Sequence, residues 1–134
     1  HYIEHVRCKN EPMECLEVSH MLTKEEMPAC PVATTVQLIG SKWKLLILRN
    51  LLARPWRFNE MKKSLDGISQ KVLSDSLRSL EEDGIVTRTV YPEVPPRVEY
   101  SLSELGESMR PIISAMEQWG RDYQELVQGK GPSR

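Results

Sequence analysis

The sequence predicts a mainly α-helical fold with one small β-hairpin. Three observations support this: residues 69–83 have the spacing of an amphipathic helix, residues 85–102 have the pattern of a hairpin, and a short helix and a turn come just before them. Helix, turn, helix and hairpin form the element order of a winged helix-turn-helix. Further helical patterns lie at both ends of this unit.

The predicted helix over residues 69–83 has one apolar and one polar face. Ser69 can cap its free amides, and Gly84 is the residue type expected just past its end. Leu73, Leu77 and Leu80 recur at helical spacing and predict the face that packs on the core. The polar face carries side chains suited to base edges and phosphates in a major groove. We therefore expect DNA contacts from Ser69, Gln70, Lys71, Ser74, Asp75 and Arg78.

The hairpin is predicted from residues 85–91 and 97–102, which are rich in valine, threonine and tyrosine. In the second strand, Val98, Tyr100 and Leu102 alternate with polar residues, which predicts one apolar and one polar face. Three prolines between the strands exclude a central sheet position and predict a stiff, protruding loop. Arg97 lies at the base of this loop, where we expect it to approach the minor groove or its phosphates.

Cys30 precedes the first predicted helix, in which Pro31 suits the first position and Gly40 marks the end. The N-terminus of a helix favours thiolate over thiol, whereas the nearby Glu25 and Glu26 oppose it. The alternative is that Cys30 is a small buried hydrophobic residue. Val32, Val36 and Ile39 form the apolar stripe of this helix.

A second helix is predicted from Lys42 to about residue 52, almost wholly buried and capped by Ser41. Lys42 and Lys44 lie in its first turn, where cations oppose the helix dipole. A phosphate bound at this N-terminus would explain them, and solvated surface lysines are the alternative. We expect phosphate contacts from Ser41, Lys42 and Arg57.

Residues 56–58 predict a short strand that pairs with the hairpin, and Asn59 is expected to cap the short helix that follows. After Ser103, which is expected to cap it, a helical pattern continues to about residue 127, and Pro111 should bend or divide it. The apolar stripe of this last helix needs a partner surface, either a second copy of the chain or its own core. We expect a homodimer, with contacts from Ile112, Met116, Trp119 and Tyr123.

The length of 134 residues and the composition, with 40% hydrophobic and 28% charged residues, fit one globular domain. We expect it over residues 30–127, with an acidic extension over 1–29, either a native arm or derived from a tag, and a tail over 128–134. Apolar runs are too short to span a membrane, and three irregularly spaced cysteines favour reduced thiols in a cytoplasmic protein. His5, Cys8, Cys15 and His20 match no zinc spacing, so we expect no metal and no cofactor.

The net charge of −1 argues weakly against nucleic-acid binding, but the charge is unevenly distributed. Residues 41–101 carry eleven basic and eight acidic residues, whereas residues 1–30 carry three and six. The basic excess therefore coincides with the predicted helix-turn-helix and hairpin. Because the excess is mild, a dimer would be needed to double the contacts.

Four segments resemble the HxlR-type transcription regulators, bacterial winged-helix proteins related to the MarR group: CPV at 30–32, LIGSKWKLLIL at 38–48, residues 57–86, and YPEVPPRVEYSLSELG at 91–106. The resemblance implies a homodimeric DNA-binding repressor or activator whose recognition helix starts at Ser69 and whose wing tip is the loop at 92–97. It implies dimerisation through the N-terminal segment, the first helix with Val32 and Val36, and the C-terminal helix. It also implies that Cys30 matches a cysteine with which several members sense oxidants or electrophiles. An intersubunit disulfide through Cys8 or Cys15 is an alternative with weaker support.

We therefore expect a dimeric, sequence-specific transcription regulator of double-stranded DNA that reads a pseudo-palindromic operator and responds to an oxidant or electrophile at Cys30. The alternatives are a winged-helix module that binds protein, and a regulator that responds to a small ligand without a thiol switch. No phosphate-binding glycine loop or nucleophile–base pair is evident, so we do not expect an enzyme.

Overall fold

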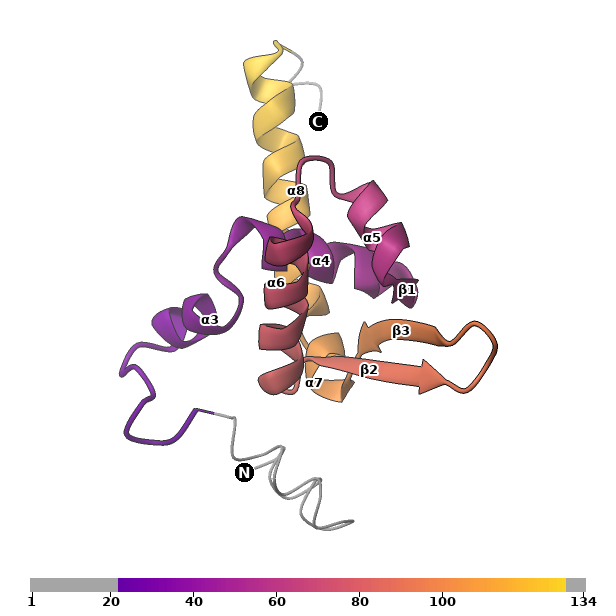
Figure 1. The fold of residues 1–134 in the computed structure, drawn as a ribbon. Coiled ribbons are helices and arrows are strands. Elements are labelled where there is room, and N and C mark those ends of the chain that lie inside the picture. The colour runs from indigo at the N-terminus through magenta and orange to yellow at the C-terminus, as the bar shows by residue number, and fades with distance from the viewer. Residues whose placement is uncertain (1–21, 130–134) are drawn as a thin grey trace.

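A computed structural model describes residues 22–129 and confirms the winged helix-turn-helix (Figure 1). Strands β1, β2 and β3 form one antiparallel sheet in the order β1-β3-β2, and β2 and β3 are the wing. Helices α5 and α6 are the helix-turn-helix. The elements in chain order are α3 (Pro31–Ile39), α4 (Lys42–Ala53), β1 (Trp56–Arg57), α5 (Phe58–Ser64), α6 (Gln70–Glu82), β2 (Val86–Tyr91), β3 (Arg97–Leu102), α7 (Glu104–Glu107) and α8 (Arg110–Val127).

The helix boundaries follow local signals in the sequence. The hydroxyl oxygens of Ser41, Ser69 and Ser103 each accept a hydrogen bond from a backbone amide three residues further on, which confirms these caps. Gly84, just past α6, has a φ of 80°, a conformation that side chains with a Cβ rarely adopt. Pro111 lies in the first turn of α8, so the predicted C-terminal helix is divided into α7 and α8.

One predicted cap is wrong. Asn59 does not cap α5, because the helix already begins at Phe58 and Arg57 occupies the cap position. The carboxylate of Glu60 instead accepts the backbone N–H of Arg57 at 3.0 Å. Since a glutamate can reach back from the third helical position, the helix starts two residues earlier than an Asn59 cap would give.

The core lies between α4, α6, the sheet and the first turns of α8, and α6 contributes the leucines predicted from its spacing. Leu73, Leu77 and Leu80 are at most 1% exposed. The prediction that α4 is almost wholly buried is wrong, because Arg49 is exposed and several apolar residues of α4 are only partly covered. The buried apolar residues are Ile39, Ile47, Leu48, Leu51, Met61, Leu65, Ile68, Leu73, Leu77, Leu80, Ile85, Val86, Met109 and Ile113.

The sheet fixes the wing relative to α5. In the register of β1 and β3, Trp56 lies opposite Tyr100 and Arg57 lies opposite Glu99, which confirms that residues 56–57 join the hairpin. Strand β3 therefore lies in the centre of the sheet, and all six of its residues are half-buried. The predicted apolar face of β3 is confirmed for Tyr100 and Leu102, which pack against the core, whereas Arg97 and Glu99 pair with each other. Burial alone does not separate the two faces, because all six residues are half-buried.

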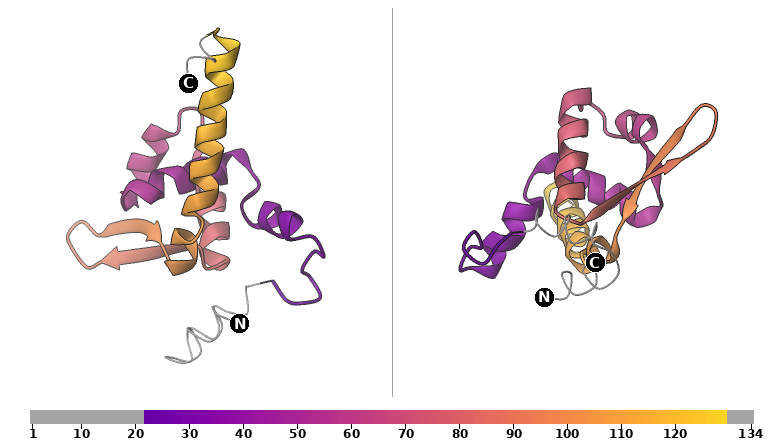
Figure 2. Two further views of the ribbon diagram at one scale, coloured as in Figure 1. Left: turned by 180° about the vertical axis from the view of Figure 1, so that it is seen from behind. Right: turned by 60° about the horizontal axis from the view of Figure 1, so that its bottom comes forward.

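Helices α3 and α8 project from the compact part (Figures 1 and 2). Helix α3 lies on the side of α6 opposite to α5 and the wing. Only Ile39 of α3 and Ile113 of α8 are buried. The end of α8 nearest to α7 packs on the core, while its outer half extends away from it (Figure 2).

Candidate nucleic-acid interface

The polar face of α6 is the centre of the candidate interface. Because its leucines are buried, Gln70, Lys71, Asp75 and Arg78 are exposed, and Ser74 is half-buried. Ser69 is exposed, but its hydroxyl oxygen already accepts the amide of Val72 at 3.1 Å.

The charged residues of this face form a chain of ion pairs. Lys71 Nζ lies 2.9 Å from Asp75 Oδ2, and Arg78 Nη1 lies 3.5 Å from Asp75 Oδ1. The hydrogen bond from Lys71 lowers the pKa of Asp75, so this carboxylate stays ionised at neutral pH. Both cations are therefore paired in the free protein, and binding to DNA requires phosphates or bases to compete with Asp75.

The wing cation Arg97 is similarly occupied. Its guanidinium lies 2.7 Å from carboxylate oxygens of both Glu93 and Glu99, and 3.8 Å from the centre of the Tyr91 ring, the residue paired with it across the hairpin. The hydrogen bonds that Arg97 donates to the Glu93 carboxylate lower the pKa of Glu93 and raise the pKa of Arg97. Only 24% of the Arg97 side chain is exposed. Arg97 therefore ties the wing loop to its strands, and its predicted DNA contact needs these bonds to open.

The two lysines at the start of α4 have different surroundings, and Lys44 fits neither interpretation. Lys44 neither points to a phosphate nor lies free in solvent: its Nζ donates to Ser79 Oγ of α6 at 2.8 Å and to Leu38 O of α3 at 3.4 Å. Lys42 is exposed, with its Nζ 4.5 Å from the centre of the Trp43 ring. Ser41 is exposed, and its hydroxyl oxygen accepts the amide of Lys44 at 3.1 Å. Of the two lysines, only Lys42 is placed to meet a phosphate.

Arg57 is exposed between α5 and the wing. The pKa of Glu60 is lowered mainly by the hydrogen bond from the backbone amide of Arg57, and that of Glu93 mainly by the hydrogen bond from Arg97. The charge of Arg57 lowers both pKa values further. Arg57 thus belongs to the same charged surface as the wing carboxylates.

Sequence reasoning missed polar residues on α5 and β2, of which Asn59 and Lys63 are exposed and Lys62 is half-buried. Asn59, Lys62 and Lys63 line a shallow hollow of about 320 Å³ on one face of α5, and Arg88 is exposed on the edge strand β2. The spacing i, i+3, i+4 of the α5 residues was the available signal. Asn59 was predicted as a helix cap, and the two lysines carried no predicted role.

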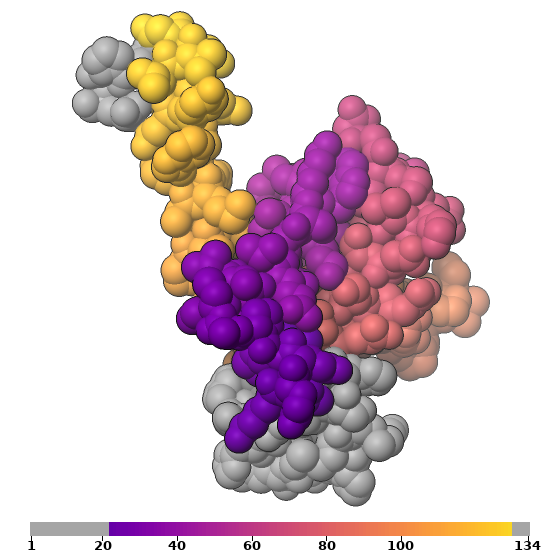
Figure 3. All heavy atoms as spheres, turned by 90° about the vertical axis from the view of Figure 1, so that its left-hand side faces the viewer, coloured from indigo at the N-terminus to yellow at the C-terminus, as the bar shows by residue number. Residues whose placement is uncertain are grey.

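The residues predicted for dimerisation are exposed. Val32 and Val36 of α3 are 70% and 56% exposed, and Trp119 of α8 is 69% exposed. Ile112, Met116 and Tyr123 also lie at the surface, and the rings of Trp119 and Tyr123 stack with centres 5.5 Å apart. The outer half of α8 stands clear of the rest of the described chain (Figure 3). This apolar stripe has no covering element among residues 22–129.

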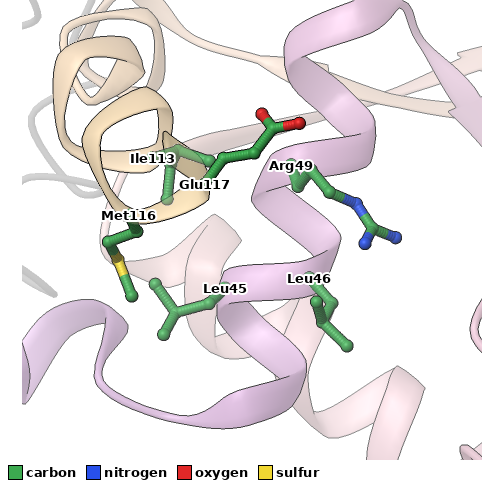
Figure 4. A pocket seen from close by; sticks show the side chains of 6 residues that line it. All are labelled: Leu45, Leu46, Arg49, Ile113, Met116 and Glu117. Carbon is green, nitrogen blue, oxygen red and sulfur yellow. The ribbon is translucent and has the colours of Figure 1, made fainter. Parts of the chain in front are cut away.

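An apolar pocket of about 230 Å³ lies between α4 and α8 (Figure 4). Leu45, Leu46, Ile113 and Met116 form its apolar wall. Arg49 and Glu117 also line the pocket, and each is held elsewhere: Arg49 donates to Asn50 Oδ1 at 3.0 Å, and Glu117 pairs with Arg121 at 2.8 Å. Because Met116 belongs to both, the pocket is continuous with the exposed stripe of α8.

Cys30 is an exposed free thiol at the N-cap of α3, where its side chain makes no capping hydrogen bond. The alternative of a buried Cys30 is therefore wrong. His5, Cys8, Cys15 and His20 lie outside the described residues. Within residues 22–129, no three His, Cys, Asp or Glu side chains are grouped as metal ligands. No helix in this part of the chain has the length and apolar character to cross a bilayer.

The fold and its exposed recognition helix define a transcriptional regulator with a helix-turn-helix DNA-binding fold. The chain belongs to the HxlR-like helix-turn-helix family, whose model matches residues 38–128. Proteins of this family that resemble the chain are transcriptional regulators and not enzymes, as the sequence predicted.

Three similar proteins illustrate the relationship. The HTH-type transcriptional regulator YdeP of Bacillus subtilis is 43% identical over 105 residues, which cover 78% of this chain and 82% of YdeP. The redox regulator HypR in its reduced form superposes with a TM-score of 0.70 and 41% identity, over 75% of this chain and 99% of HypR. Diamide-treated YodB of B. subtilis superposes with a TM-score of 0.60 and 36% identity, over 70% of this chain and 94% of YodB.

Replacing Asp75 tests the competition between this carboxylate and DNA. We expect Asp75→Asn to strengthen binding to unrelated DNA and to steepen the salt dependence of log K by about 1 for each protomer, because Lys71 becomes free to meet a phosphate. Fluorescence anisotropy over a range of salt concentrations measures both effects. Glu107→Gln, which releases Arg110 from a similar surface pair on another element, is the control. Equal gains in both variants would contradict a specific role for Asp75.

Proposed function

We propose that this protein is a homodimeric, sequence-specific regulator that reads a pseudo-palindromic operator with the two α6 helices of the dimer. The exposed polar face of α6, held outward by the burial of Leu73, Leu77 and Leu80, carries this proposal. Recognition helices of such a dimer enter successive major grooves, so half-site centres should lie about 10 bp apart or a multiple of that distance.

Each candidate residue has a role set by its chemistry. Gln70 can bond to adenine, Arg78 to guanine and Asp75 to cytosine through base edges in the major groove. Lys71, Ser74 and Ser69 complete the helix surface. Ser41, Lys42 and Arg57 contact phosphates on either side, and Arg97 leaves its carboxylate partners to reach the minor groove or its phosphates.

DNA binding is tested with an operator selected from random DNA and, in parallel, with the DNA that flanks the gene of this protein. We expect tight binding that weakens steeply with salt. Arg78→Ala should lose about 10- to 100-fold in affinity for the operator and little for unrelated DNA, if Arg78 reads a base. Fluorescence anisotropy at two salt concentrations distinguishes these effects. Failure to select any DNA would favour a winged-helix module that binds protein.

A second copy of the chain is the proposed cover for the apolar surface of α3 and α8. Trp119 and Tyr123 offer the stacked aromatic surface that dimer interfaces use most often, and Val32 and Val36 extend the apolar area. The pocket between α4 and α8 adjoins this stripe and would take a side chain of the partner.

Trp119→Glu tests this interface without disturbing the core, because Trp119 is largely exposed. We expect the dissociation constant of the dimer to rise at least ~30-fold, since a central aromatic contributes about 2 kcal/mol or more. Sedimentation velocity over a range of concentrations measures the constant, and circular dichroism checks the fold. Ser114→Glu, an exposed position on the opposite face of α8, is the matched control. Equal dimerisation of wild type and Trp119→Glu would place the interface elsewhere.

We also propose that oxidation or alkylation of Cys30 changes DNA affinity. An exposed thiol at the start of α3 supports this, together with the likeness to HypR, named a redox regulator, and to YodB in a diamide-treated form. Because α3 belongs to the proposed dimer surface, modification of Cys30 would act by changing how two recognition helices are spaced.

Treatment with diamide or a quinone should change operator affinity by about 5- to 150-fold, the usual range of coupling between two sites. We expect Cys30→Ser to bind like the reduced wild type and to ignore both reagents. A variant with Cys8→Ser and Cys15→Ser should respond like the wild type. If Cys30→Ser still responds, the thiol at position 30 is not the sensor. If even the wild type ignores both reagents, the regulator responds to another signal, and the pocket between α4 and α8 becomes the site to examine.

A further inference from the structure

We propose that the face of α5 formed by Asn59, Lys62 and Lys63 binds a phosphate of the DNA backbone beside the groove that α6 enters. The inference rests on the proposed function, because it assigns a further contact to the same DNA. It concerns residues outside the recognition helix and the wing.

The three side chains are arranged for one anionic group. They lie at positions i, i+3 and i+4 of α5 and so point to one side of the helix. Together they line an open hollow of about 320 Å³. Two ammonium groups supply charge, and the amide of Asn59 supplies a further donor, which is the combination that phosphate oxygens accept.

The charges of this face are free, unlike those of the other candidate elements. Lys71 and Arg78 are paired with Asp75, Arg97 is paired with Glu93 and Glu99, and Lys44 is bound inside the protein. Within the described chain, neither Lys62 nor Lys63 makes a hydrogen bond or ion pair, and the side chain of Asn59 has no partner.

The acidic neighbours do not neutralise this face. Glu60 accepts the backbone amide of Arg57 and pairs with Arg54, and Asp66 in the following turn forms no ion pair with either lysine. The face of α5 therefore offers positive charge that DNA can use without first breaking a pair.

The position of α5 fits this role. In a helix-turn-helix, the first helix crosses the DNA backbone while the second lies in the major groove. Helix α5 is that first helix, joined to α6 by residues 65–69, and it lies on the side of α6 towards which the wing extends (Figures 1 and 2). A phosphate bound there would set how far α6 enters the groove, and the contact would not depend on base sequence.

A purely structural role would also explain two lysines in the last turn of α5, because cations stabilise the C-terminus of a helix. The two roles predict different effects of Asn59→Asp on DNA binding: a structural role predicts no loss of affinity, and a phosphate contact predicts weaker binding. Asn59 lies in the first turn, where a carboxylate stabilises the helix, but the same carboxylate would repel a phosphate in the hollow.

The test compares the double variant Lys62→Gln/Lys63→Gln, Asn59→Asp and the control Lys24→Gln with the wild type. Lys24 is an exposed lysine of the segment before α3, on the side of the molecule away from α5. Anisotropy titrations with operator and unrelated DNA give the slope of log K against log salt, and urea unfolding gives stability.

We expect the slope of log K against log salt to be shallower by about 2 in the double variant, because each of the two protomers loses one phosphate contact. The double variant should also bind both DNAs at least ~10-fold more weakly at low salt. Asn59→Asp should bind DNA more weakly without loss of stability, and Lys24→Gln should match the wild type. An unchanged slope in the double variant, with the operator still preferred, would overturn this inference and leave the proposed function standing. If the wild type itself shows no salt-sensitive DNA binding, both are wrong.

Discussion

The burial of three leucines in α6 is the constraint on which the rest of the structure depends. Leu73, Leu77 and Leu80 are almost completely covered, and burying each contributes about 1.5–3 kcal/mol. A helix can be rotated about its axis only if this burial is given up, so the leucines fix which residues face the solvent. Turning α6 by one residue would carry Ser74 and Arg78 towards the core, where an unpaired charge is costly. The polar face is therefore set by packing and not by any contact of its own.

Charge pairing shapes the same surface in a second way. The carboxylates of Asp75, Glu93 and Glu99 each pair with a cation, Lys71 or Arg97, that the sequence predicted to contact DNA. The pairs of Asp75 are exposed and therefore weak, because water and salt screen them, so phosphates can displace this carboxylate. The pairs of Arg97 are partly buried and less screened, so they are harder to displace. Until these pairs open, the paired cations contribute little long-range attraction. Unpaired lysines on α5 would then supply the attraction, while the paired residues of α6 add discrimination at short range.

The sequence was informative where a structural signal is local. Serine caps, the glycine after α6, the proline that divides the C-terminal helix and the leucine stripe are all set by residues within one or two turns, and each was predicted. The sequence was uninformative where long side chains choose between distant partners. Lys44 bonds to Ser79, 35 residues away, and Arg97 stacks on the residue facing it across the hairpin. The cap of α5 was mispredicted because Glu60 satisfied the amide that Asn59 was expected to bind.

Lys44 also bears on how a signal at α3 would reach α6. Its Nζ joins the carbonyl oxygen of Leu38, in the last turn of α3, to the hydroxyl of Ser79 on the recognition helix. Helix α3 is otherwise held to the core mainly through Leu38 and Ile39 in its last turn, so few contacts oppose the displacement of its first turns. A modification at Cys30 can change DNA affinity only if it has a different free energy in two arrangements of α3. Because α3 is sparsely packed, two arrangements of this helix would differ little in free energy. Lys44 bonds to both α3 and α6, so a shift of α3 would change a contact of the recognition helix.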